Sequence, residues 1–224
     1  MLLAGLLLLL LLFAPTLYVR GVMARHGRDR PDLPGTGGEL ARHLLDLAGL
    51  PHVAVDRTDQ GDHYDPVAQA VRLSPRHLDG RSITAIAVAA HEVAHAVQHR
   101  DGSRMLLWRL RLVRWLAKAE RVAVVVFVGV PLLAVLLHLP ILMAGLLGFG
   151  IGAMALGILV HALTLPVELD ASFRRALPAL SRGGYLADRD LRRARSVLWA
   201  AALTYLAGAL VSLLNVFRWG RMFR

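Results

Sequence analysis

The most informative stretch of this sequence is residues 82–98, which read SITAIAVAAHEVAHAVQ. Apolar residues three and four apart predict a helix, and Ser82 is a residue type that commonly caps a helix N-terminus. Within that helix His91 and His95 are four residues apart, so both imidazoles lie on one face. Glu92 adds a carboxylate beside the first imidazole. The stretch therefore predicts a helix that presents a metal-binding pair of histidines together with an acidic group.

This pair of histidines has the geometry that zinc favours. Two imidazole nitrogens at about 2.0–2.1 Å take two tetrahedral corners, a third protein ligand takes another, and water takes the fourth. Glu92 is placed to act as general base towards that water and then to protonate the leaving amine. The alternative is that His91 and His95 are hydrogen-bonded core residues, but an unpaired Glu92 among alanines and valines would be costly to bury. The sequence therefore favours one zinc ion per chain and peptide-bond hydrolysis.

The third zinc ligand has two candidates. Asp101 stands ten residues after His91, as in the extended motif whose third ligand follows on the same segment. That motif has a glycine where this chain has Gln98, and glutamine continues a helix. Glu168 comes from a distant segment, LPVELDAS at residues 165–172, whose proline is expected to begin a helix. The alternative role of Glu168 is a carboxylate near a helix N-terminus. We favour Glu168 as third ligand, because Asp101 is more simply explained as the end of the first helix.

The polar region around this helix, residues 20–103, is expected to form a small α+β domain. Apolar spacing predicts a helix over 39–47, and apolar alternation predicts strands over 53–55 and 67–73. An extended peptide commonly pairs with an exposed strand edge near the zinc, and the second strand is the candidate edge, with an ordinary interior strand as the alternative. The substrate-binding residues expected on it are Val67, Ala68, Gln69, Ala70 and Val71.

Three further residues could donate a hydrogen bond to the tetrahedral oxyanion, namely His63, Tyr64 and His99. The sequence does not distinguish among them. His63 and Tyr64 are also counted with the substrate-binding residues. His99 lies four residues beyond His95 and is either a further metal ligand or an exposed histidine at the helix end.

The composition of the 224-residue chain is strongly apolar. Apolar residues make up 56% of it, against roughly 45–50% in an average soluble domain. They cluster in four stretches without formal charge, at residues 2–19, 122–137, 141–165 and 197–216, each about as long as a bilayer-spanning helix requires. Cysteine is absent, which excludes disulfides, cysteine-ligated zinc and thiol catalysis. The expected fold class is a mainly α membrane protein, with transmembrane helices plus a small α+β zincin-like domain.

The formal charge of +10 comes from 26 basic and 16 acidic residues that flank the apolar stretches. The positive-inside rule then places the zinc domain on the cytoplasmic side. Residues 104–121 alternate leucine with arginine and carry Trp108 and Trp115, which predicts a basic amphipathic helix on anionic lipid headgroups. A solvated helix that packs on the domain is the alternative. No recognition motif interleaves the arginines with aromatics, so nucleic acid is not an expected partner.

These features predict six consecutive parts. They are an N-terminal transmembrane anchor at 1–19, a zinc peptidase domain at 20–103, a basic amphipathic interfacial helix at 104–121, a transmembrane hairpin at 122–165, a cytoplasmic segment with the third zinc ligand at 166–195 and a C-terminal transmembrane helix at 196–217. The last part is either a span or an interfacial segment, because the arginines that follow it would lie outside, against the positive-inside rule.

Several motifs resemble those of the YugP-type neutral zinc metallopeptidases of bacterial membranes. The resemblance rests on DHYDP at 62–66, VRLSP at 71–75, GRSI at 80–83, AVAAHEVAHAVQ at 87–98 and LPVELDAS at 165–172. It covers essentially the whole chain, with the motifs in the same order and between similar apolar flanks. The resemblance implies a membrane-bound zinc peptidase with His91 and His95 as ligands and Glu92 as base.

The family is also similar to the gluzincin membrane proteases, which supports Glu168 as the third ligand. Those relatives have an aspartate four residues after the ligand glutamate, where this chain has Ser172, and the aspartate here is Asp170. We therefore expect a zinc metalloendopeptidase of the cell (inner) membrane, multi-pass, with its zinc domain in the cytoplasm and a peptide or membrane-protein substrate. The alternative is a non-catalytic zinc-binding membrane scaffold or pseudoprotease.

Overall fold

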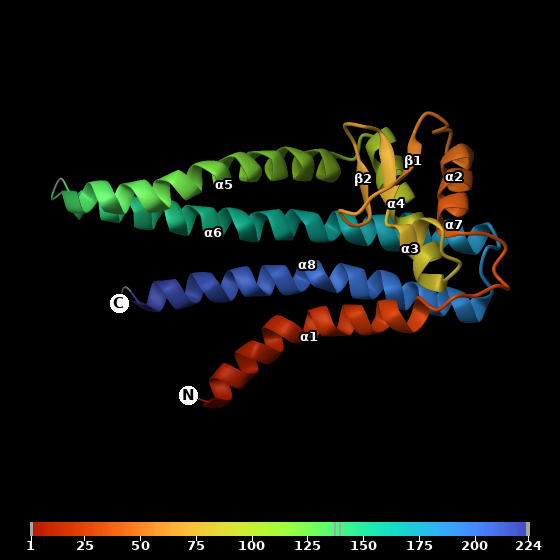
Figure 1. The fold of residues 1–224 in the computed structure, drawn as a ribbon, viewed down its shortest axis with the longest axis horizontal. Coiled ribbons are helices and arrows are strands. Elements are labelled where there is room, and N and C mark those ends of the chain that lie inside the picture. The colour runs from red at the N-terminus through yellow and green to blue at the C-terminus, as the bar shows by residue number, and fades with distance from the viewer. Residues whose placement is uncertain (1, 137, 139, 223–224) are drawn as a thin grey trace.

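The long helices of the computed structural model run side by side, and a compact region lies at one end of them (Figure 1). These helices are α1 (Leu2–His26), α5 (Arg104–Leu136), α6 (Pro140–Leu169) and α8 (Asp188–Met222). The structure describes residues 2–136, 138 and 140–222. Helix α6 contacts both α5 and α8, and α8 also contacts α1. The compact region is thus attached to a layer of packed helices.

The compact region carries the shorter elements. In chain order they are α2 (Gly37–Leu47), β1 (Ala54–Arg57), β2 (His63–Asp65), β3 (Ala70–Leu73), α3 (Pro75–Leu78), α4 (Ile83–Arg100), the π-helical turn η1 (Asp170–Ala176) and α7 (Leu177–Arg182). The side chain of Ser82 accepts a hydrogen bond from the backbone N–H of Ala85 at the start of α4. The predicted N-cap and helix start are therefore confirmed.

Strand β3 occupies the centre of the small sheet. The strand order is β1-β3-β2, with β1 parallel and β2 antiparallel to β3. Strand β3 therefore has hydrogen-bonded neighbours on both sides, and the exposed edge expected over 67–73 is not found. Residues 67–69 instead form part of the turn between β2 and β3. The edge strand β2, which was not predicted, contacts α4, as β3 does.

The core of the compact region surrounds α4. This helix contacts α2 and η1 as well as α8, and its residues Ile83, Ile86 and Val93 are buried. A helix that is apolar nearly all round is a buried helix. Because other elements pack on several sides of α4, the few polar side chains that it carries are held in fixed directions.

The stretches expected to cross a membrane lie in the long helices. Of the predicted spans, residues 2–19 lie in α1, 122–136 in α5, 140–165 in α6 and 196–217 in α8; residues 1, 137 and 139 lie outside the described residues. Among the described residues, no helix combines the length and the apolar character that a bilayer crossing requires. The expected fold class with transmembrane helices is therefore wrong, and so is the multi-pass membrane location that was inferred from it.

The physical reason for this correction is that an apolar run does not reveal whether lipid or other parts of the protein surround it. A helix packed on other helices has the same composition as a helix that faces lipid. Helices α1 and α8, α8 and α6, and α6 and α5 contact one another. An apolar run in such a helix therefore does not by itself identify a membrane span.

The helix ends also differ from the expected boundaries. A boundary was predicted between residues 121 and 122, but helix α5 continues across it. Helix α8 likewise continues across the boundary predicted between residues 195 and 196. Pro166 does not begin a helix but lies inside α6, three residues before its end. The apolar content changes at these positions without a change in backbone conformation, so composition alone could not locate the helix ends.

Gly37→Ala should destabilise the compact region. A Cβ at Gly37 would lie 2.2 Å from the carbonyl oxygen of His77 and 2.9 Å from that of Ala85. Backbone atoms cannot move aside as a flexible side chain can, and overpacking of this kind costs about 1–3 kcal/mol. The urea midpoint of unfolding should therefore fall. Gly21→Ala is the control, since a Cβ there meets nothing within 4 Å, and equal midpoints for the two variants would contradict the expectation.

Candidate metal centre

Helix α4 brings the two predicted histidines to one face. His91 and His95 are both buried, and their rings meet edge to face with centroids 4.6 Å apart. The two Nε2 atoms are 3.2 Å apart. The spacing of four residues on the helix therefore brings the Nε2 atoms of His91 and His95 close enough together to bind one metal ion.

Glu168, one residue before the end of α6, completes a group of three. Its Oε2 is 3.0 Å from Nε2 of His91 and 3.5 Å from Nε2 of His95. A tetrahedral zinc site with arms of about 2.1 Å has edges of about 3.4 Å. The three separations between the donor atoms are close to that value, and two imidazoles with one carboxylate are donors that zinc prefers. The group therefore fits zinc in both chemistry and spacing.

The two histidines also determine the charge of Glu168. This residue is 2% exposed, and burial alone would raise the pKa of its carboxyl group. The hydrogen bonds and charges of His91 and His95 outweigh burial and hold the pKa of Glu168 well below its usual range. Glu168 is therefore ionised, which is the state in which a carboxylate binds a metal.

Gln98 fixes the orientation of His95. Its Nε2 donates to the carbonyl oxygen of Val167 at 3.0 Å and to Oδ2 of Asp170 at 2.8 Å. The amide oxygen of Gln98 therefore faces His95, whose Nδ1 donates to it at 2.9 Å. With one proton held on Nδ1 by Gln98, it is Nε2 of His95 that can give up its proton and ligate a metal beside Glu168.

Ser172 supports His91 from the opposite side. Its Oγ is 3.1 Å from Nδ1 of His91, and it lies in η1, four residues after Glu168. π-helical turns occur frequently at functional sites. The serine that departs from the relatives' pattern thus contacts a histidine of the site, while Asp170 accepts a hydrogen bond from the side-chain amide of Gln98.

Glu92 faces the same cavity as the three candidate ligands. The cavity has a volume of about 170 Å³ and is lined by residues of β2, α4, α5, α6 and α8. Burial raises the pKa of Glu92 to about 7, with the charge of His91 opposing this effect and that of Glu168 reinforcing it. A carboxyl group with a pKa near neutrality can both take up and return a proton.

The predicted substrate-binding residues separate into two sets. His63 and Tyr64 of β2 line the cavity. The remaining five do not, since 67–69 are exposed in the turn and the next two residues are buried in the central strand β3. A peptide cannot pair with the main chain of β3, because β3 has a neighbouring strand on each side. Strand β2 lies at the edge of the sheet, beside the cavity.

His99 and Asp101 lie outside the group of three. Nδ1 of His99 is 2.9 Å from the hydroxyl oxygen of Tyr64. Asp101 is the C-cap residue of α4 and pairs with Arg100 and Arg175. The structure therefore brings Glu168, and not Asp101, to the two imidazoles.

Four residues at this site had no predicted role in it, namely Gln98, Arg109, Ser172 and Tyr205. Arg109 and Tyr205 line the cavity from α5 and α8. Burial and the charge of Glu168 raise the pKa of the Tyr205 hydroxyl. One signal was available for Arg109, because Leu106, Arg109 and Leu110 have the three and four residue spacing of one helix face. Nothing local to Tyr205 indicates that α8 would approach α4.

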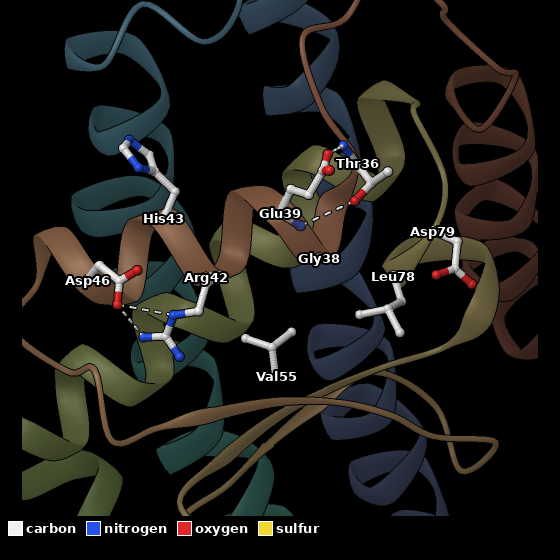
Figure 2. Close-up of a pocket in the computed structure, with 9 residues that line it drawn as sticks. All are labelled: Thr36, Gly38, Glu39, Arg42, His43, Asp46, Val55, Leu78 and Asp79. Carbon is white, nitrogen blue, oxygen red and sulfur yellow. Dashed lines mark hydrogen bonds and ion pairs between the residues drawn. The ribbon is translucent and has the colours of Figure 1, made fainter.

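A larger pocket beside α2 has no comparable group. It has a volume of about 750 Å³ and lies between α2, β1 and α3 (Figure 2). Its charged side chains have partners already: Glu39 and Thr36 form a capping box, Arg42 pairs with Asp46, and Asp79 pairs with Arg57. Among the described residues, the metal-binding group found is at α4 and not in this pocket. The smaller cavity is therefore the candidate centre.

Comparison with known proteins finds one matching family model and one similar protein. Residues 1–224 match the model of a family described as "Putative neutral zinc metallopeptidase". The chain is 40% identical over 190 residues to "Putative membrane protease YugP" of Bacillus subtilis (strain 168), an alignment that covers 84% of this chain and 80% of the relative. No solved structure matches the chain at a significant level.

Proposed function

Since the chain belongs to the putative neutral zinc metallopeptidase family, we propose that it hydrolyses peptide bonds with one zinc ion held by His91, His95 and Glu168. The observation that carries this proposal is the group of three donor atoms spaced as the corners of a zinc site, with Glu92 in the same cavity. Zinc bound there would polarise a peptide carbonyl and lower the pKa of a water molecule to about 7.

Glu92 is the general base of the proposed reaction. It follows His91 directly on α4, and it is buried but still reaches the cavity. Its carboxylate takes a proton from the attacking water, and the resulting carboxylic acid then gives the proton to the leaving amine. The raised pKa of Glu92 suits a group that must do both.

Strand β2 is the surface on which we expect an extended substrate to lie. It is an edge strand, and His63 and Tyr64 line the cavity from it. The backbone N–H of Tyr64 also interacts with Glu92 and lowers the pKa of its carboxyl group. The main chain of β2 therefore faces the proposed reaction centre, where it can pair with the main chain of a peptide.

Metal removal tests the proposed function. Treatment of the full chain with a zinc chelator should abolish cleavage of a casein-type substrate, and added zinc should restore it, because the three donors would lose and regain the ion. Magnesium is the control, since it prefers oxygen ligands and should not restore cleavage. Cleavage that survives complete removal of zinc would contradict the proposal. Stoichiometric zinc without any turnover would instead favour a non-catalytic zinc-binding protein.

A further inference from the structure

The two carboxylate oxygens of Glu168 have different surroundings. Oε2 lies between the Nε2 atoms of His91 and His95. Oε1 is buried on the other side of the carboxylate, and no well-aligned hydrogen-bond donor reaches it from any residue that the structure describes. A buried carboxylate oxygen without a compensating group is unfavourable. A positively charged group close to Oε1 would therefore stabilise the carboxylate and fix its orientation.

Arg109 supplies that charge. Its Nη1 is 3.0 Å from Oε1 of Glu168, so a cation from α5 is paired with the candidate third ligand at the end of α6. The side chain of Arg109 is 23% exposed, whereas Arg111 and Arg114 on the same helix are exposed. Helix α5 thus turns Arg109 into the cavity and its basic neighbours away from it.

We propose that Arg109 is a positioning residue that restricts Glu168 to a single ligand oxygen. This inference rests on the proposed zinc site. A carboxylate can bind a metal through one oxygen or through both, and a cation held at Oε1 competes with the metal for that oxygen. With Oε2 alone available, the protein supplies three donors, and a fourth position remains for water or the peptide carbonyl.

The arrangement also explains why an arginine is suited to this place. Its guanidinium stays charged at any working pH, and its long apolar stem can pass Leu106 and Leu110, which line the same cavity. The positive charge withdraws electron density from Glu168. A zinc ion bound to a carboxylate paired in this way would be a stronger Lewis acid.

Cobalt(II) bound to the full chain in place of zinc tests the inference through its visible absorption. Four-coordinate cobalt absorbs strongly and five-coordinate cobalt weakly. Arg109→Met keeps the length of the side chain but removes its charge and its donors. It should still bind cobalt, with a several-fold loss of absorbance per ion as both oxygens of Glu168 become ligands. Arg109→Lys restores a positive charge and should recover most of the absorbance.

Arg111→Met is the matched control, because Arg111 lies on the exposed side of α5 beside Trp108. Its cobalt spectrum should equal that of the unmodified chain. An unchanged spectrum for Arg109→Met would overturn the positioning role while leaving the metal site intact. If Arg109→Met does not fold, as judged by circular dichroism, a weak spectrum for a folded Arg109→Lys would overturn it instead. Failure of the unmodified chain to bind cobalt or zinc would refute the proposed metal site itself.

Discussion

Glu168→Ala should weaken zinc binding by about 10²–10³-fold. Structural zinc sites are worth about 10–16 kcal/mol, which corresponds to roughly 3 kcal/mol for each of four ligands. The oxygen that Glu168 offers is within 3.5 Å of both imidazole nitrogens, and the described chain provides no other carboxylate in the group. Competition against a chromophoric chelator measures the loss directly. Glu168→Gln, which keeps the shape of the side chain, should lose affinity as well because it removes the ligand charge.

Asp101→Ala is the decisive comparison for this prediction. Asp101 has the spacing of a third ligand in the extended motif, but its carboxylate pairs with Arg100 and Arg175 at the end of α4. Its removal should leave zinc affinity unchanged. Loss of the metal in Asp101→Ala, with normal binding in Glu168→Ala, would show that the ligand set is wrong.

The part of the site that could be predicted is the part that one helix determines. The spacing of His91 and His95 places their nitrogens together whatever the rest of the chain does. Ser82 and the apolar spacing after it locate the start of that helix, as the hydrogen bond to Ala85 confirms. Local rules of this kind need no knowledge of tertiary packing.

The remaining parts of the site depend on packing that local rules do not describe. Glu168 meets His91 across 77 residues of sequence because η1, which directly follows α6, packs against α4. Arg109 reaches the same carboxylate from a third helix. The sequence favoured Glu168 over Asp101, a choice that the resemblance to the gluzincin membrane proteases supported, but it offered no reason to connect Arg109 with it.

The errors in the fold have two separate causes. Strand β2 has only three residues, too few to show the alternation that identifies a strand, so its neighbour was taken for the sheet edge. The apolar helices were taken for membrane spans because the prediction rested on composition, and composition does not record what a helix packs against. The first error arises from the shortness of strand β2, and the second from the unknown surroundings of the apolar helices.

Glu92→Gln should keep zinc and lose about 10²–10⁴-fold in turnover, the usual contribution of a general base. The change preserves the size of the side chain but removes the group that accepts the proton of the attacking water. Glu92 is not among the three residues whose donor atoms converge, so the amide should leave zinc affinity and stoichiometry unchanged. Zinc content by elemental analysis and turnover on a fluorogenic peptide measure the two effects separately.

Glu39→Gln provides the control for a general effect of removing a glutamate. Glu39 lies at the start of α2, where glutamine can also complete a capping box, so this variant should retain both zinc and turnover. The two measurements on Glu92→Gln then separate the possible roles of this residue. Loss of zinc together with activity would make Glu92 a ligand, and normal turnover with zinc bound would remove it from the reaction. Only a zinc-loaded, inactive Glu92→Gln is consistent with a base that acts beside His91 without binding the metal.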